Sequence, residues 1–129
     1  MKLLLDTCAF LWWMGAPDKL SPNAAEAICS PDSLLHLSAA SAWEISVKRQ
    51  LGRLDLPKPT NDFLIEACST HAVTLLGISV MEAVAAGELP LHHKDPFDRM
   101  LIAQTLTEPG MRLVSPDKEF AAYGVDLLW

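Results

Sequence analysis

The chain has 129 residues, of which 50% are hydrophobic and 20% are charged, and its net charge at pH 7 is −6. This length suits one domain, residues 1–129, with a proper core, and no apolar run reaches the roughly 18 residues that a membrane span needs. A simple nucleic-acid-binding protein is usually basic, so the acidic balance disfavours that class unless divalent cations carry the positive charge at the site.

The first expected element is a short buried strand at residues 2–5, within the N-terminal segment MKLLLDTCAFLWWMG. Its apolar run resembles a signal peptide, but Asp6 interrupts the run and no clear small-residue cleavage site follows. We therefore expect a cytoplasmic protein. The three cysteines are odd in number and widely spaced, which favours small buried side chains over a disulfide framework or a zinc site.

Strands and helices alternate along the rest of the chain. Apolar runs predict further strands at 33–38, 72–78, 111–115 and 125–129. Capping residues, prolines and glycines predict helices at 21–30, 38–52, 61–71, 79–89, 96–108 and 116–124. This alternation indicates an α/β fold in which a five-stranded parallel sheet is covered by helices on both faces.

Four acidic residues fall where the predicted strands end or the predicted helices begin. Their positions are Asp6, Glu44, Asp98 and Asp117. In an open α/β sheet the carboxyl ends of the strands and the N-termini of the crossover helices share one edge, which is where sites form. We expect the four carboxylates to meet at that edge.

Most of these acids also have a structural explanation. Glu44 completes a capping-box pattern with Ser41, and Asp98 follows an expected N-cap residue, Asp95, and a proline at the first helical position. Asp117 follows a Ser-Pro pair in the same way. Acids near helix N-termini are favoured by the helix dipole, so each of these three residues alone is adequately explained without chemistry.

Asp6 is harder to explain structurally, because a carboxylate directly after a buried strand has no cap to make unless the next helix starts at once. Several carboxylates at one sheet edge also raise one another's pKa unless a cation lies between them. Oxygen ligands of this kind suit Mg²⁺ or Mn²⁺. The set of acids therefore predicts a metal site.

Four segments in family order resemble the PIN-domain proteins, and more narrowly the VapC ribonuclease toxins of toxin–antitoxin pairs. They are LLLDTCAFLWW, SAASAWEISVKRQLGRL, LPLHHKDPFDRMLIAQ and LVSPDKEFAAYGV. The resemblance implies a three-layer α/β/α sandwich and a metal-dependent endoribonuclease. Such an enzyme hydrolyses RNA by in-line attack of a metal-activated water on the phosphodiester. The resemblance also implies an RNA substrate, a VapB-type antitoxin as partner and a homodimer.

In that family the acidic site would be Asp6, Glu44, Asp98 and Asp117, with Thr7 beside the first. Asp6 and Asp98 would be the main metal ligands. Glu44 would hold a metal or orient the attacking water, and Asp117 would act through metal-bound waters.

Several neighbouring residues keep two interpretations. Thr7 either orients Asp6 by hydrogen bonding or caps the following helix, and Arg99 either contacts a phosphate or is a solvated arginine. The basic segment 48–53 is either a solvated helix end or a rim that contacts RNA or the antitoxin. Adjacent His92 and His93 cannot chelate together, so exposed loop histidines are expected there rather than ligands.

Two other functions compete with the nuclease. A phosphatase of the haloacid dehalogenase type also places an aspartate after its first strand, but it needs a second aspartate two residues later, where this chain has Cys8. A non-catalytic PIN-like scaffold would only bind RNA or protein. Because all four acidic positions are filled, the sequence offers no support for lost activity.

Overall fold

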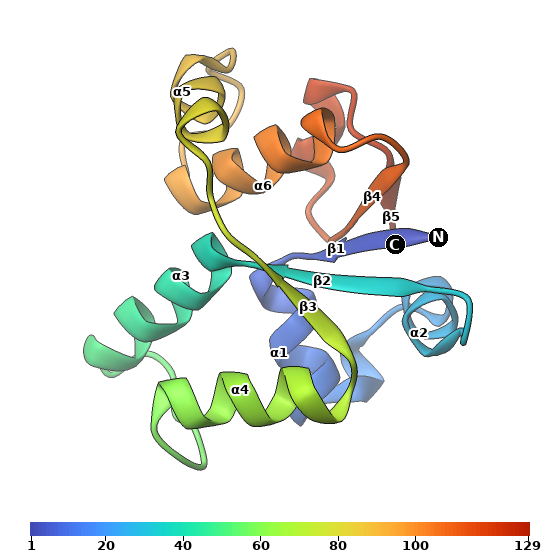
Figure 1. Cartoon of the computed structure of the whole chain (residues 1–129), viewed down its shortest axis with the longest axis vertical. Coiled ribbons are helices and arrows are strands. Elements are labelled where there is room, and N and C mark those ends of the chain that lie inside the picture. Colours follow the sequence, from blue (N-terminus) through green and yellow to red (C-terminus); the bar gives the residue numbers. More distant parts are fainter.

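A computed structural model describes residues 1–129, and Figure 1 shows its arrangement. In chain order the elements are β1 (Lys2–Leu5), α1 (Thr7–Gly15), the 3-10 helix η1 (Pro17–Lys19), α2 (Pro22–Cys29), β2 (Leu34–Ser38), α3 (Ala39–Gln50), α4 (Thr60–Thr70), β3 (Val73–Leu76), α5 (Val80–Glu88), α6 (Pro96–Thr107), β4 (Met111–Val114), the 3-10 helix η2 (Lys118–Tyr123) and β5 (Leu127–Leu128). All five predicted strands are confirmed, although every strand after the first is shorter than predicted. The helix predicted at 116–124 is a 3-10 helix instead.

The five strands form one parallel sheet in the order β3-β2-β1-β4-β5. The predicted parallel sheet with helices on both faces is therefore confirmed. Strand β1 lies at the centre, with β2 on one side and β4 on the other, so the strand order reverses around it. A crevice opens beyond the carboxyl ends of the strands at such a switch point. Asp6, which directly follows β1, lies at this position.

Side chains of β1 alternate between two hydrophobic clusters. Leu3 and Leu5 join α1, α2, α3 and α4 in the larger cluster, whereas Leu4 joins α6, β4 and Phe120 in the smaller one. Figure 1 shows the first group of helices on one face of the sheet and α5 and α6 on the other. A strand buried on both faces is apolar, which explains the three leucines that follow the half-buried Lys2 in β1. None of the helices is both long and apolar enough to cross a membrane.

The segment that connects α5 to α6 is fixed by two side chains rather than by secondary structure. The guanidinium of Arg99, which is only 7% exposed, donates to the carbonyls of four residues, at distances of 2.8–3.2 Å. These acceptors are Gly87, Leu89, Pro90 and His93. The Tyr123 hydroxyl accepts the backbone N–H groups of His92 and His93 and donates to Pro90.

Both predicted roles of Arg99, phosphate contact and free solvation, are therefore wrong. Its Nη1 and Nη2 donors are turned into the protein, where the fork of the guanidinium matches several carbonyl oxygens at once. Arg99 positions the loop that precedes α6, and thereby the acids at the start of that helix.

We expect Arg99→Met to lower the free energy of unfolding by roughly 3 kcal/mol, because four carbonyls lose a charged donor. Arg49→Met is the matched control, since Arg49 makes a single side-chain hydrogen bond, to Thr60, and should change the value by less than about 1 kcal/mol. Urea denaturation measures both. Equal losses in the two variants would contradict the role assigned to Arg99.

Candidate functional site

A cavity of about 250 Å³ opens at the carboxyl edge of the sheet. Its lining consists of Asp6, Thr7, Cys8, Glu44, Lys48, Asp95, Asp98, Pro116 and Asp117. All four acids selected from the sequence are present, together with Thr7 and Asp95, and they come from four separate segments of the chain. Arg99 is absent because its side chain is turned into the loop. The expected convergence of the acids at the sheet edge is therefore observed.

Asp6 does have a structural role, because the next helix starts at once, which is the condition under which a cap was expected. Helix α1 starts at the next residue, and the Asp6 carboxylate caps it by accepting the backbone N–H of Ala9 at 2.6 Å. The residue is 5% exposed. Burial raises the pKa of Asp6 to about 6, hydrogen bonds from Ser115 and Ala9 oppose that rise, and the charges of Glu44 and Asp117 add to it. A cap alone would favour the ionised form, so the cost of burying the Asp6 carboxylate outweighs the effect of the cap.

Glu44 is not part of a capping box. Helix α3 begins directly after β2, at Ala39, and the Ser38 hydroxyl accepts the backbone N–H of Ala40 at 3.0 Å. Ser41 and Glu44 therefore lie inside the helix, and both are buried. One Glu44 oxygen, Oε2, is 2.8 Å from Lys48 Nζ, while the buried Oε1 has no hydrogen-bond partner. An unpartnered buried carboxylate oxygen is costly, and it faces a site where a ligand could satisfy it.

Thr7 takes neither of its two predicted roles. Its hydroxyl donates to the Ser41 hydroxyl at 2.9 Å, and both residues are buried. Asp6 already caps α1, so no cap is left for Thr7 to make. The bond instead joins the first turn of α1 to α3, which fixes the distance between Asp6 and Glu44.

Asp95 is confirmed as the N-cap of α6. Its Oδ1 accepts the backbone N–H groups of Phe97 at 2.9 Å and Asp98 at 3.2 Å, and Pro96 occupies the first helical position. Asp98 consequently lies in the first turn and lines the cavity. Burial raises the pKa of the Asp98 carboxyl above its usual range, and the nearby charge of Asp95 raises it further.

Asp117 caps the 3-10 helix η2 and is the most exposed of the four acids. Its Oδ1 accepts the N–H of Glu119 at 2.9 Å, and its own N–H donates to the Ser115 hydroxyl at 3.1 Å. The N-cap of this helix is therefore Asp117, two residues after Ser115, where the cap was expected. The Asp117 side chain is 37% exposed and lines the cavity, and its second oxygen, Oδ2, lies 3.3 Å from the ring of His93.

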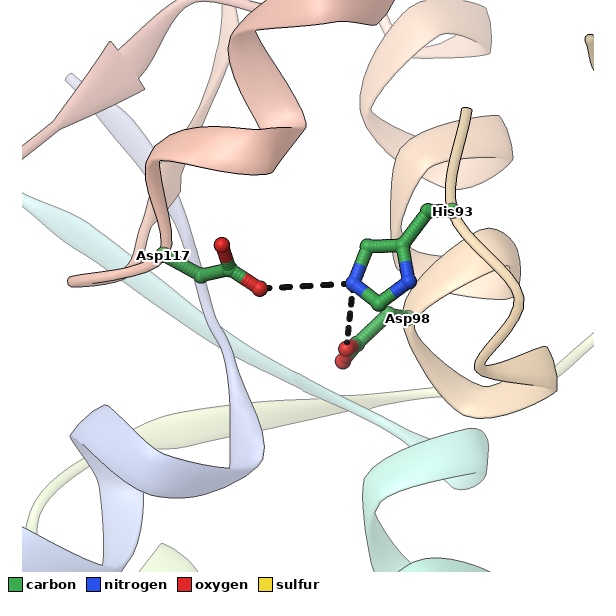
Figure 2. A group of neighbouring side chains, drawn as sticks. All are labelled: His93, Asp98 and Asp117. Carbon is green, nitrogen blue, oxygen red and sulfur yellow. Dashed lines mark hydrogen bonds and ion pairs between the residues drawn. The ribbon is translucent and has the colours of Figure 1, made fainter. Parts of the chain in front are cut away.

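His93 was wrongly expected to be an exposed loop residue. Its side chain is 11% exposed, and Figure 2 shows the ring between Asp98 and Asp117. The Nε2 atom lies 3.0 Å from Asp98 Oδ2 and 3.3 Å from Asp117 Oδ2. No spacing in the sequence signals this contact, because it depends on the loop that Arg99 and Tyr123 hold. His92, in contrast, is exposed as expected.

Lys48 is the second residue that the sequence did not assign to the site. Burial lowers the pKa of Lys48, but the hydrogen bond and the charge of Glu44 outweigh this effect and the net direction is upward. The available signal was the spacing of four residues between Glu44 and Lys48, which places both on one helix face. Within the segment 48–53, this lysine thus lies at the cavity rather than on a purely solvated end.

The donor set of the cavity fits a hard divalent cation. It offers carboxylate oxygens from four acids, and one ligand atom each of His93, Asp98 and Asp117 lie within 4.8 Å of one another. Burial raises the pKa of the neighbouring Cys8 thiol to about 11, so the metal-free protein holds this thiol protonated at neutral pH. Buried carboxylates with raised pKa values and an unpartnered oxygen are the groups that a bound cation would stabilise.

Comparison with known proteins identifies the family. The model of the PIN domain matches residues 3–126. The chain belongs to the PIN domain family. A VapC-type PIN protein, Ribonuclease VapC22 of Mycobacterium tuberculosis, is 33% identical over 122 residues, which span 94% of this chain and 91% of that relative.

A solved structure shows the same PIN fold at lower sequence identity. The crystal structure of VapBC2 from Rickettsia felis bound to a DNA fragment from their promoter superposes with a TM-score of 0.71 at 12% identity. The match covers 98% of this chain and 97% of that chain. The family model and the sequence relative identify this chain as a VapC-type PIN protein, and the solved structure shows the shared fold.

The raised pKa of Asp6 predicts a pH-dependent stability in EDTA. The pKa of an aspartate is near 3.9 in an unfolded chain, and that of Asp6 in the folded protein is about 6. Ionisation of the Asp6 carboxyl therefore costs more free energy in the folded state than in the unfolded state. The contribution of Asp6 to stability is fully present below about pH 4 and is lost as the pH rises through about 6.

We therefore expect Asp6→Asn, which retains a capping oxygen, to melt several degrees above the wild type at pH 7.5, with the gap closing towards pH 4. Thermal denaturation followed by circular dichroism measures the melting temperatures. Asp18→Asn alters an exposed carboxylate and should show no gap at either pH. If the wild type melts at a higher temperature than Asp6→Asn at pH 7.5, the claim that the ionised Asp6 carboxylate destabilises the fold is wrong.

Proposed function

We propose that this VapC-type PIN protein is a Mg²⁺- or Mn²⁺-dependent endoribonuclease and the toxin of a type II toxin–antitoxin pair. The observation that carries the proposal is the convergence of Asp6, Glu44, Asp98 and Asp117 in one cavity. The relative named as a ribonuclease supports the reaction class, since it aligns over almost the whole chain. A pocket this acidic would repel an RNA phosphodiester unless cations reversed the local field.

In this proposal Asp6 and Asp98 are the principal metal ligands, and Glu44 and Asp117 complete the set. One or two divalent cations would supply Lewis acidity and stabilise the charge that develops on the phosphoryl oxygens. The two most buried groups, Asp6 and Glu44, approach from the centre of the sheet and from α3, whereas Asp98 and Asp117 approach from α6 and η2.

Two further side chains have roles that follow from their contacts. Glu44 Oε1 has no partner, so it can accept a hydrogen bond from the attacking water and orient it for in-line displacement. Lys48 holds the other Glu44 oxygen, which fixes the carboxylate in this orientation. The Lys48 side chain is 44% exposed and can also donate to a non-bridging phosphate oxygen of the substrate.

The apolar groove along α1 is the surface that we assign to a VapB-type antitoxin. It has a volume of about 400 Å³, and its lining is Leu11, Trp12, Met14, Gly15, Leu54, Asp55, Leu56, Pro57 and Phe63. A groove of this composition suits the apolar face of a partner segment. On the opposite side of the molecule, Val80 and Met81 are more than 80% exposed on α5, which supports a homodimer through that helix.

The proposed catalytic site predicts opposite outcomes for two aspartates three residues apart. Asp98→Asn should lower RNA cleavage by roughly 100-fold or more, whereas Asp95→Asn should retain most activity because asparagine also caps a helix. Asp6→Ala should likewise abolish cleavage. The assay is cleavage of RNA by the purified protein with Mg²⁺ or Mn²⁺, and EDTA should stop it. Wild-type rates in both Asp6→Ala and Asp98→Asn would refute the site, and the reverse order of the two asparagine variants would mean that Asp95 is the ligand.

The antitoxin surface predicts a separation of binding from catalysis. Leu11→Glu should abolish co-purification of the co-expressed antitoxin, since it places a charge in the apolar groove, and should leave RNA cleavage intact. Val84→Glu, on the exposed face of α5, is the control and should retain the antitoxin. Loss of the antitoxin with Val84→Glu but not with Leu11→Glu would move the binding surface to α5.

A further inference from the structure

The hydrogen bonds of the His93 ring define which nitrogen carries the proton. Nδ1 lies 3.3 Å from the backbone N–H of Asp95 and accepts from it. A nitrogen that accepts has a free lone pair, so the proton of the neutral imidazole lies on Nε2. Nε2 in turn faces Asp98 Oδ2 at 3.0 Å and Asp117 Oδ2 at 3.3 Å, as Figure 2 shows. The ring therefore presents a donor to the two carboxylates.

The ring is held in this position from several sides. It packs against Phe120, which is fully buried, with 5.6 Å between the ring centroids. The His93 carbonyl accepts from Arg99 and its backbone N–H donates to the Tyr123 hydroxyl. A residue in an irregular loop is thus fixed at both backbone groups and at the ring, which is the arrangement of a preorganised group rather than of a surface histidine.

We propose that His93 is a positioning residue that donates its Nε2–H to Asp98 and Asp117, and so holds these two carboxylates at the spacing that a shared cation requires. The proposal rests on the function proposed above. Asp98 belongs to α6 and Asp117 to η2, and the structure shows no other side chain hydrogen-bonded to both. Without His93 no side chain would bridge the two like charges in the metal-free protein, and their repulsion would favour a wider separation.

The same hydrogen bonds argue against His93 as a nitrogen ligand, although its ring lies within reach of a metal bound to Asp98 and Asp117. A ligand needs the Nε2 lone pair, and that would require the ring proton to move to Nδ1. The Nδ1–H would then point at the Asp95 N–H, so two donors would face each other and a hydrogen bond would be lost. His93 thus leaves the metal an all-oxygen set of ligands, which is the kind that Mg²⁺ prefers.

The test measures Mn²⁺ binding to the full-length protein, stripped with EDTA, by isothermal titration calorimetry. His93→Leu should weaken binding about 10- to 100-fold, and His93→Gln should restore much of it, because the glutamine amide can donate from a similar place. His92→Gln changes the exposed neighbour and should bind as the wild type does. Electron spin-echo spectroscopy of the Mn²⁺ complex should show no directly bound imidazole nitrogen.

Two outcomes would overturn the positioning role. One is wild-type affinity in His93→Leu, and the other is a ligated nitrogen signal that His93→Leu removes. Long-range proton–nitrogen correlation spectra of the metal-free wild type test the tautomer independently of any variant, and a proton on Nδ1 would also contradict the proposal. The Asp98→Asn variant distinguishes failure of the proposed metal site from failure of the His93 role. If the wild type binds Mn²⁺ and Asp98→Asn does not, the metal site is supported independently of His93. If the wild type does not bind Mn²⁺, both proposals fail.

Discussion

Removal of carboxylates from water at the end of a buried strand is the constraint on which this structure depends. Leu3, Leu4 and Leu5 are completely buried, and the chain continues directly from them into Asp6. The carboxylate cannot turn to solvent without breaking the cap of α1. Its position is therefore determined by the apolar core, and the cost of keeping it there appears in its raised pKa.

The other residues at this edge of the sheet do not offset the free-energy cost of burying the Asp6 carboxylate. Hydrogen bonds from Ser115 and Ala9 favour the ionised form of Asp6, but burial and the neighbouring acids outweigh them. The single cation that contacts an acid directly in the cavity, Lys48, is paired with Glu44. Binding of a divalent cation to the folded chain would be linked to its stability, because a ligand that binds only the folded state stabilises it. Metal binding at the site and folding of the chain would therefore be coupled.

The sequence predicted the elements and the convergence of the acids because those features follow from local patterns. Apolar runs predicted the strands, and Pro96 after Asp95 correctly predicted the start of α6. The start of α3 was predicted to within one residue, but its cap was misassigned, because Ser38 and Ser41 are both plausible caps by composition. The end of β2 decides between them, since the chain must turn into the helix directly after Ser38 leaves the sheet.

Roles that depend on long-range contacts were beyond any local pattern. Arg99 reaches back to carbonyls up to 12 residues earlier, and Tyr123 bonds a loop about 30 residues before it. These two residues place His93 between acids from separate elements, so its role required the folded loop. Thr7 is similar, because its partner Ser41 is 34 residues away. Pairings of this kind follow from the packing of α1 against α3 and from the place of Phe120 of η2 in the hydrophobic cluster that also contains α6.

The central claim is that this edge of the sheet is a metal site built from acids that the fold holds apart from water. The most direct test is crystallographic: the protein is crystallised with Mn²⁺ and diffraction is measured at the manganese absorption edge. The account predicts an anomalous peak in the cavity, bonded to oxygens of Asp6 and Asp98. A cavity without a peak at saturating Mn²⁺, or a peak bound only by acids outside this set, would contradict it.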